Sequence, residues 1–396
     1  MPVLIAALGA CLISLDSSVN VALPGMAAAF GASPSLLRWV IVCYVLTYAL
    51  TGLAAGIVAD RVGAMPVFAT GVWVVAGAFA AYGVAPSFGW VLVLRVVQGV
   101  GAGLVFGTAP ALVTLSLPPE RHGRGLGAMS LGLGAGLSLG PLIAGVLVEM
   151  TGWRGAFVYR APLAIALALA LPLARVSTGR PPAHARGMAG ADVLRWSVIK
   201  TIALAFLANC AQFSLWLLAP FYLSTALGFP ARVAGVFFTL MPFGTTLASP
   251  AAGWTTDRVG PRWPMRAGLL VEMAGLLVLG GAPLSATTAA IGLGLVGLGV
   301  GLFQVPNIAR MMSGFPRSQH GAAGGLAFLG RTLGSAAGAQ LSGILFEASL
   351  PDRGFTGSLQ WTFSISAAIC LVGFALALTP DTRRGDGAGR LTGGVS

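Results

Sequence analysis

Long apolar runs separated by short polar turns dominate the sequence. Twelve of these runs are long enough, at about 20 residues each, to cross the hydrocarbon core of a bilayer as helices. The predicted spans are 3–29, 37–59, 66–84, 88–114, 124–148, 155–174, 197–223, 232–256, 264–283, 287–312, 321–346 and 358–378. The pattern therefore predicts an all-α integral membrane protein.

The second half of the chain repeats features of the first half. The motif Asp-Arg-Val-Gly begins at Asp60 and again at Asp257. Glycines recur in one register, as Gly99, Gly101, Gly103, Gly127, Gly132, Gly136, Gly140 and Gly145 and then as Gly297, Gly299, Gly301, Gly325, Gly330, Gly334, Gly338 and Gly343. A regular repeat of this kind indicates duplicated structural units, so we expect two homologous six-helix bundles.

The domain boundaries follow from the one polar stretch of any length between two spans. It covers residues 175–196 and contains several arginines and two prolines. We therefore expect an N-terminal bundle over 1–174, a cytoplasmic linker over 175–196, a C-terminal bundle over 197–380 and a cytoplasmic tail over 381–396.

Composition and charge support a membrane protein and argue against nucleic-acid binding. Only 9% of the residues are charged and 56% are hydrophobic, whereas a soluble domain carries roughly 25% charged residues. The formal net charge is +12, but the arginines are scattered through short loops rather than clustered on one face.

Positive residues favour the cytoplasmic side, and placing both termini in the cytoplasm leaves few of them outside. The loop residues left outside are Arg38, Arg154, Arg232 and Arg353. We expect a multi-pass protein of the cell membrane, acting as a monomer.

Two ionisable residues inside the spans are the main candidates for chemistry, because charges at this depth are costly and are functional hypotheses by default. Asp16 lies halfway along the first span, where a carboxylic acid can exchange protons or bind a cationic substrate. Arg95 lies in the fourth span and would pair with Asp16 until a proton or substrate competes. For both residues a purely structural role in helix packing is the alternative.

Other polar residues within the spans are candidates for contact with a substrate. The candidates are Asn20, Gln98, Asn209, Gln212, Trp216 and Arg331. Glu272, in the ninth span, could attract a cationic substrate, but pairing with an arginine is the expectation we favour.

The fifth span and the two charged turns suggest conformational roles. Small residues at four-residue steps let a partner helix approach closely, and a proline bends a helix. The residues with this pattern are Gly136, Gly140, Pro141 and Gly145. The turns contain Asp60, Arg61 and Gly63 in one half and Asp257, Arg258 and Gly260 in the other. We expect these turns to form a cytoplasmic gate through charge pairing; plain solvated turns are the alternative.

Several of these stretches resemble the major facilitator superfamily. The sequence from Gly56 to Gly63 is similar to its loop motif between spans two and three, although Ala64 and Met65 replace two basic residues. The stretch from Leu15 to Pro24 resembles the signature of the drug:proton antiporters that usually have fourteen helices, whereas twelve are predicted here. In that branch the helix-five motif at Gly140-Pro141 is typical of exporters, so the resemblance implies export.

Motifs for other chemistry are missing from the sequence. It has no phosphate-binding loop of the GxxxxGK[ST] kind, and His122, His184 and His320 lack metal-ligand spacing. We therefore expect no enzyme, no cofactor and no metal. The predicted function is a secondary transporter that couples protons, or another cation, to efflux of small drug-like or toxic compounds by alternating access. The alternatives are a substrate-specific metabolite exporter or importer and, from another class, a transport-incompetent membrane sensor.

Overall fold

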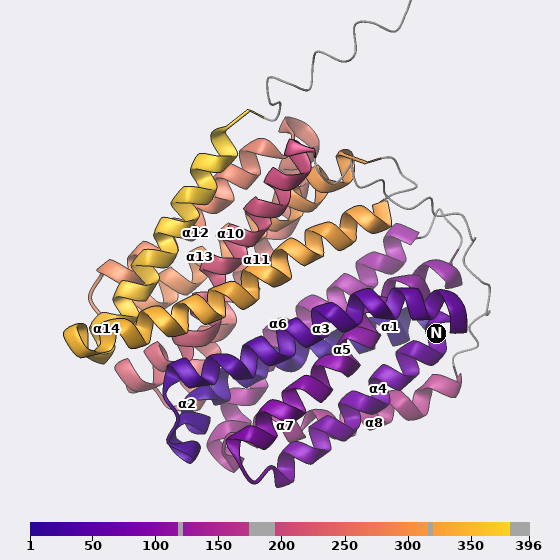
Figure 1. Cartoon of the computed structure of the whole chain (residues 1–396), viewed down its shortest axis with the longest axis horizontal. Coiled ribbons are helices and arrows are strands. Elements are labelled where there is room, and N and C mark those ends of the chain that lie inside the picture. Colours follow the sequence, from indigo (N-terminus) through magenta and orange to yellow (C-terminus); the bar gives the residue numbers. More distant parts are fainter. Residues whose placement is uncertain (118–121, 174–194, 316–319, 381–396) are drawn as a thin grey trace, which may run out of the picture.

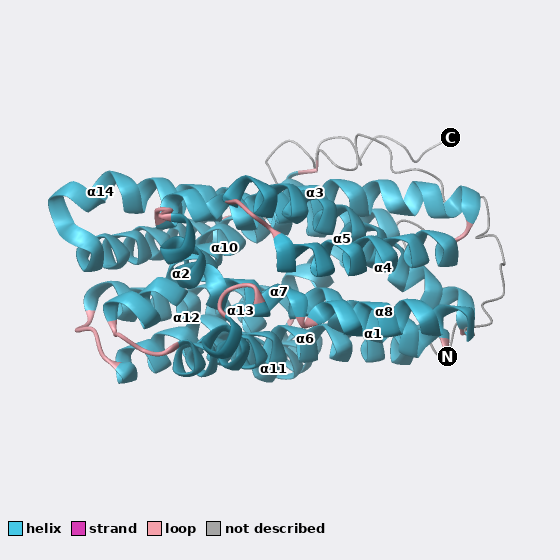
Figure 2. Ribbon diagram, turned by 90° about the horizontal axis from the view of Figure 1, so that it is seen from below, coloured by secondary structure: helices cyan, strands magenta, loops and turns pink. Residues whose placement is uncertain are grey.

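The computed structural model describes residues 1–117, 122–173, 195–315 and 320–380, and every regular element in them is helical (Figure 2). The first half contains α1 (Pro2–Ser14), η1 (Leu15–Ser17), α2 (Ser18–Phe30), α3 (Pro34–Val62), α4 (Ala64–Ala81), η2 (Tyr82–Val84), α5 (Phe88–Ser116), α6 (His122–Thr151), α7 (Gly155–Val158), α8 (Arg160–Ala170) and η4 (Leu171–Leu173). The second half contains α10 (Trp196–Phe221), η5 (Tyr222–Ala226), α11 (Ala231–Val259), α12 (Arg262–Gly281), α13 (Ala286–Ser313) and α14 (His320–Leu378). The predicted linker, apart from its last two residues, and the predicted tail 381–396 lie outside the described residues.

These elements make twelve membrane crossings in the described part of the chain. Ten helical ranges are long and apolar enough to span a bilayer. The last of them, Leu326–Leu378, turns back on itself at Gly354, whose φ of 64° is available to glycine at little cost. The shorter apolar helix Gly155–Ala170 supplies the remaining crossing. Most predicted span edges agree with the observed ones to within one turn of helix.

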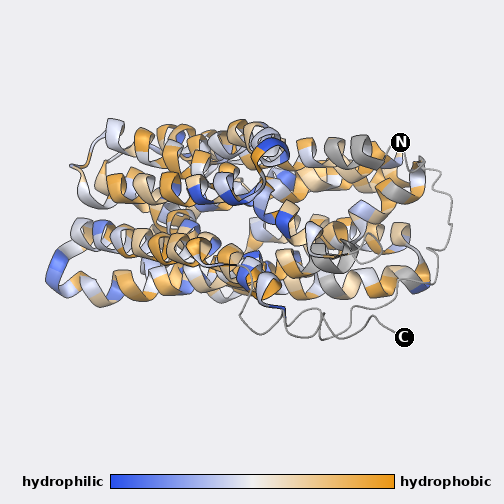
Figure 3. Ribbon diagram, turned by 90° about the horizontal axis from the view of Figure 1, so that it is seen from above, coloured by the Kyte–Doolittle hydropathy of each residue, from blue (hydrophilic) through white to orange (hydrophobic). Residues whose placement is uncertain are grey.

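The outer surface of the helices is apolar, as expected for contact with lipid. Leu50, Leu131, Met150 and Leu169 are 69%, 74%, 75% and 65% exposed. Figure 3 shows hydrophobic residues along the lengths of the helices. A soluble protein rarely exposes apolar surface on this scale, so these faces fit a hydrocarbon environment.

The sequence repeat is also a repeat of helix packing. Gly136 of α6 lies against the Cys11 carbonyl of α1, and its counterpart Gly334 of α14 lies against the Phe206 carbonyl of α10. A side chain at either glycine would collide with this backbone. The same arrangement relates Gly132–Ala7 to Gly330–Ile202 and Gly140–Leu15 to Gly338–Cys210. The two halves therefore use their duplicated glycines in the same way.

The halves meet along a seam formed by α6 with α11 and by α3 with α14 (Figure 1). At one end, which we call the shared end, a single hydrophobic core contains residues of both halves, such as Leu23 and Phe238. At the opposite end, the divided end, where Gly63 and Gly260 lie, each half has its own core. The halves are thus joined by apolar packing at the shared end.

Candidate functional site

The first crossing is interrupted at Asp16. Helix α1 ends at Ser14, the 3₁₀ turn η1 carries Asp16, and α2 begins at Ser18. Serine side chains compete with the helix for backbone groups, and here Ser17 Oγ donates to the Leu137 carbonyl of α6 at 3.1 Å. Asn20 Nδ2 in turn donates to the Ser17 carbonyl at 3.2 Å. The interruption places the Asp16 carboxylate at the level where the crossing changes from one helix to the next.

Three side chains converge on this carboxylate, and together with Asp16 we call them the charged cluster: Asp16, Arg95, Gln98 and Arg160. Arg95 binds in bidentate fashion, with Nη1 2.8 Å from Oδ1 and Nη2 2.9 Å from Oδ2. Arg160 Nη1 lies 2.8 Å from Oδ1, and Gln98 Nε2 donates to Oδ1 at 2.6 Å. The sequence suggested the Asp16–Arg95 pair, and the structure brings these residues together.

Sequence reasoning missed Arg160. It is fully buried at the start of α8, with its guanidinium 4.4 Å from the centre of the Phe79 ring. The available signal was an arginine inside an apolar run, because such a charge needs a partner and few acids lie within the spans. Its reach to Asp16 from the sixth crossing could not be deduced from spacing.

Neighbouring groups fix the cluster in place. Arg95 Nε donates to the Val40 carbonyl of α3 at 2.6 Å, and its guanidinium lies 4.3 Å from the centre of the Tyr44 ring. The Tyr82 hydroxyl donates to Gln98 Oε1 at 3.0 Å, so the Gln98 amide is oriented with its NH₂ towards Asp16. With Arg95 2%, Arg160 0% and Asp16 12% exposed, any change of charge on Asp16 must be felt by both arginines.

The remaining cavity candidates lie in different surroundings. Asn209 is buried, and its Nδ2 donates to the Ala205 carbonyl of its own helix at 2.8 Å. Gln212 is buried. Trp216 packs edge-to-face on Phe238, with ring centres 5.3 Å apart, beside the shared core. Arg331 lies on α14 near Tyr48 of α3, at the seam. Of the six candidates, Gln98 is in the charged cluster and Asn20 bonds to its neighbour Ser17.

Glu272 of α12 does not form the expected pair with an arginine within the described residues. The side chain is fully buried, and neither carboxyl oxygen has a hydrogen-bond partner there. Its helix packs closely on Gly299 of α13, and its carboxyl group lies near the Cys370 thiol. The face of α12 that carries Glu272 thus points into the second half.

The two charged turns adopt the same backbone conformation. Gly63 ends α3 with a φ of 95°, and Gly260 ends α11 with a φ of 80°. Arg61 is exposed, and Arg258 lies 3.9 Å from the centre of the Trp254 ring. Asp257 is exposed and forms no ion pair with any other described residue, and the side chain of Asp60 lies outside what is described. The gating role of these turns stays a prediction.

The glycine-rich fifth crossing divides its contacts between the two halves. Gly136 and Gly140 face α1 and η1, whereas Gly145 lies on the seam, where a Cβ atom would be 2.9 Å from the Ala231 carbonyl of α11. Gly235 of α11 packs in turn on the Pro141 carbonyl. This pair of small residues is what lets α6 and α11 approach closely at the shared end.

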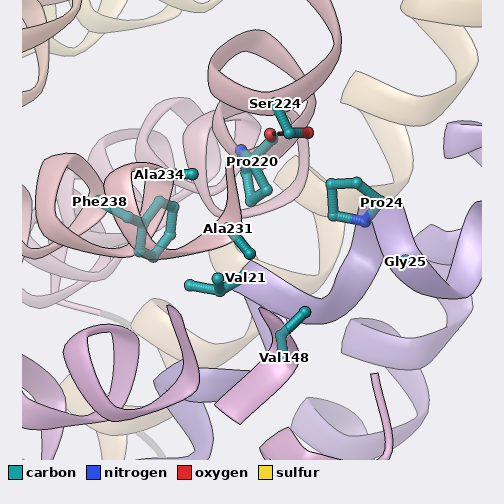
Figure 4. Close-up of a pocket in the computed structure, with 9 residues that line it drawn as sticks. All are labelled: Val21, Pro24, Gly25, Val148, Pro220, Ser224, Ala231, Ala234 and Phe238. Carbon is teal, nitrogen blue, oxygen red and sulfur yellow. Dashed lines mark hydrogen bonds between the residues drawn. The ribbon is translucent and has the colours of Figure 1, made fainter. Parts of the chain in front are cut away.

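An apolar cavity of about 160 Å³ lies beside this crossing (Figure 4). It is enclosed by Val21, Pro24, Gly25, Val148, Pro220, Ser224, Ala231, Ala234 and Phe238. The Ser224 hydroxyl is turned to the Pro220 carbonyl, to which it donates at 2.7 Å. The walls come from both halves, so the cavity belongs to the seam rather than to one bundle.

Comparison with known proteins gives relatives along most of the chain. It is 28% identical to the multidrug resistance protein Stp of Mycobacterium tuberculosis, over 87% of this chain and 75% of that protein. It is 27% identical to the tetracenomycin C resistance and export protein of Streptomyces glaucescens, over 89% of this chain and 77% of that protein. It is also 22% identical to the riboflavin transporter RibZ of Clostridioides difficile, over 95% and 96%.

Solved structures share the fold. A bacterial homolog of the human lysosomal transporter Spinster, in an inward-facing and unoccupied conformation, superposes with a TM-score of 0.83 at 16% identity, covering 95% of both chains. A D-xylose-proton symporter superposes with a TM-score of 0.76 at 15% identity, over 94% and 96%. The predicted fold class is confirmed.

The family comparison agrees with the duplicated halves, the twelve crossings and the buried charges. The sequence model of the Major Facilitator Superfamily matches residues 6–229 and, a second time, residues 201–394. The chain therefore belongs to the Major Facilitator Superfamily and is a multi-pass membrane transporter.

Proposed function

We propose that this transporter exports small organic compounds against their gradient in exchange for protons. The observation that carries the proposal is the charged cluster, in which the one carboxylate is at a break in the first crossing. A buried ion pair is strongly destabilised when one partner loses its charge. Proton binding to Asp16 would therefore release Arg95 and Arg160 together and favour a different arrangement of the helices.

The moving units of this mechanism are the two bundles, which we take as residues 1–174 and 197–380. Rocking of such halves about a site near the bilayer midplane opens it to each side in turn. In the present arrangement the bundles are joined at the shared end and separate at the divided end. Closure of the divided end would bring the turns at Asp60 and Asp257 towards the opposite bundle, where their charges can pair and interact with helix ends.

The proposed orientation has both termini, and with them the divided end, in the cytoplasm. The arginine distribution favours it, with Arg38 and Arg353 then at the outer surface. In this orientation the described conformation opens inward. Reporters fused after residue 31 and after residue 63 should report opposite sides of the membrane.

The names of the relatives favour export but differ in substrate. Two are named for drug or antibiotic resistance, and a third for riboflavin transport. A transporter of one metabolite is therefore the second candidate, and its direction would follow from the same experiment. A sensor without transport activity is the alternative from another class, and in it the carboxylate of Asp16 and its three donor side chains would serve helix packing alone.

The test is proton movement in proteoliposomes that contain a pH-sensitive dye. An imposed proton gradient should drive uphill movement of a substrate, and adding substrate should drive protons in the opposite direction. Asp16→Asn should abolish both fluxes while downhill exchange persists. Uphill transport by this variant would remove Asp16 from the coupling role, and absence of any flux with a broad compound panel would favour the sensor.

A further inference from the structure

Arg331 of α14 is an intramembrane arginine without an acidic partner among the described residues. The ion pairs found there use Arg38, Arg95 and Arg160. The Nε of Arg331 is enclosed and has no hydrogen-bond partner in the part of the chain that the structure describes, while the residue as a whole keeps some exposure. A guanidinium at this depth is costly unless something compensates its charge, so a ligand is the natural source of compensation.

The position of Arg331 is at the seam between the halves. Tyr48 of α3 packs edge-to-face on Phe328, with ring centres 5.3 Å apart, and Phe328 is one turn before Arg331 on the same face of α14. Tyr48 is also close enough to interact electrostatically with Arg331. Nearer the shared end, Gly343 of α14 packs on Arg38 of α3. Arg331 thus lies between the bundles, about three turns of helix deeper than that contact.

The charged cluster lies on the other side of the same tyrosines. Tyr44 stacks on Tyr48 with ring centres 5.9 Å apart, and the Arg95 guanidinium lies over the Tyr44 ring. The cluster contains two arginines and one carboxylate, so it has an excess of positive charge while Asp16 is ionised. Arg331 adds another positive charge across the seam. The field between the halves therefore attracts anions and repels cations.

We propose that Arg331 binds the carboxylate group of an organic anion, with the Tyr48 ring against the apolar part of the same molecule. Arginine suits this task because its planar guanidinium forms two parallel hydrogen bonds with a carboxylate. The proposal rests on the proposed transport function and narrows its substrates to organic carboxylates rather than lipophilic cations. It does not depend on the coupling ion or on the direction of transport.

Equilibrium binding to the full-length protein in lipid nanodiscs tests this site, with three probes of similar size: benzoate, benzamide and benzyltrimethylammonium. Benzoate should bind saturably and more tightly than the other two. Arg331→Gln should weaken benzoate binding about tenfold to a hundredfold, the range for hydrogen bonds to a charged group. Arg331→Lys keeps the positive charge but cannot form two parallel hydrogen bonds with a carboxylate, so it should bind benzoate with intermediate affinity.

The matched control is Arg232→Gln, which removes the same charge from an exposed position of α11. It should leave benzoate binding unchanged, because Arg232 lies where α11 packs on α6, whereas the proposed site is where α14 packs on α3. A thermal melt of each variant shows whether it is folded, and the lysine variant provides the comparison if the glutamine variant is not.

Three results would overturn the proposal. They are the absence of saturable benzoate binding to the wild type, tighter binding of benzyltrimethylammonium than of benzoate, and undiminished benzoate binding to the folded variants of Arg331. Binding without a gradient separates this inference from the proposed function. Proton-driven export that persists without benzoate binding would leave the function standing, whereas Arg331-dependent binding without proton coupling would leave only the site.

Discussion

Asp16 is the shared partner of two buried arginines, so its removal affects stability as well as transport. Asp16→Asn leaves Arg95 and Arg160 without a counter-charge, and breaking a buried ion pair costs about 3–5 kcal/mol. We expect a clear drop in the melting temperature of the purified protein, in addition to the loss of uphill transport. An unchanged melting temperature would mean that the arginines find other partners.

A second change in the same chain should separate stability from coupling. Arg160 lies against the Phe79 and Phe157 rings, and its Nε and Nη2 have no hydrogen-bond partner among the described residues. Methionine has a similar length and suits an apolar site. The double variant Asp16→Asn, Arg160→Met should therefore melt at a higher temperature than Asp16→Asn alone and still fail to transport uphill. Recovery of uphill transport would show that Asp16 carries no coupling proton.

Only part of the charged cluster could be predicted at the residue scale. The pairing of Asp16 with Arg95 follows from the cost of isolated charges in a membrane. The direction of each side chain could not be predicted, because helices that are apolar on all sides give no periodicity from which to assign faces. Asn209 was a cavity candidate by polarity alone, and its amide donates to its own helix. Arg160 was missed for the same reason, since nothing in the sequence shows which way it points.

At the scale of elements, close packing of α6 on α1 depends on glycine. A Cβ at Gly136 would collide with the Cys11 carbonyl. This carbonyl is part of the α1 backbone, so relieving the collision would require the helix itself to shift. Gly136→Ala should reduce the yield of monodisperse protein and lower its melting temperature, because overpacking reduces the free energy of unfolding by about 1–3 kcal/mol. The matched control is Gly77→Ala in α4, where a Cβ would meet no described atom within 4 Å. If both variants behave alike, glycine is not required at the α6–α1 contact.

The elements themselves were predictable because a bilayer imposes their length. About 20 apolar residues are needed for each crossing, and polar turns then mark the ends. Two features of the elements could not be predicted. The 3₁₀ turn at Asp16 depends on contacts of Ser17 with α6. The last turn, at Gly354, lies close to the start of the twelfth crossing, because the polar residues before it continue the helix of the eleventh.

At the scale of the whole molecule, the shared end closes because α6 and α11 meet through glycines. A Cβ at Gly145 would be 2.9 Å from the Ala231 carbonyl and 3.1 Å from the Arg232 Cα. Gly145→Leu should therefore destabilise the closed shared end by about 1–3 kcal/mol, which shifts the balance between conformations roughly tenfold towards opening at this end. Each bundle should stay folded, because Gly145 contacts the other half rather than its own.

Accessibility of the cavity in the seam reports this shift. Ser224 lines the cavity, so Ser224→Cys, in a chain whose four native cysteines are replaced, can be labelled by a membrane-impermeant maleimide from outside. Labelling should be faster in the Gly145→Leu variant than in the parent. Gly294→Leu in α13, where a Cβ would meet no atom of the described residues within 4 Å, should label at the parent rate. Equal rates in all three proteins would mean that the α6–α11 crossing does not control opening of the shared end, and slower labelling in Gly145→Leu would mean that the larger side chain tightens the seam.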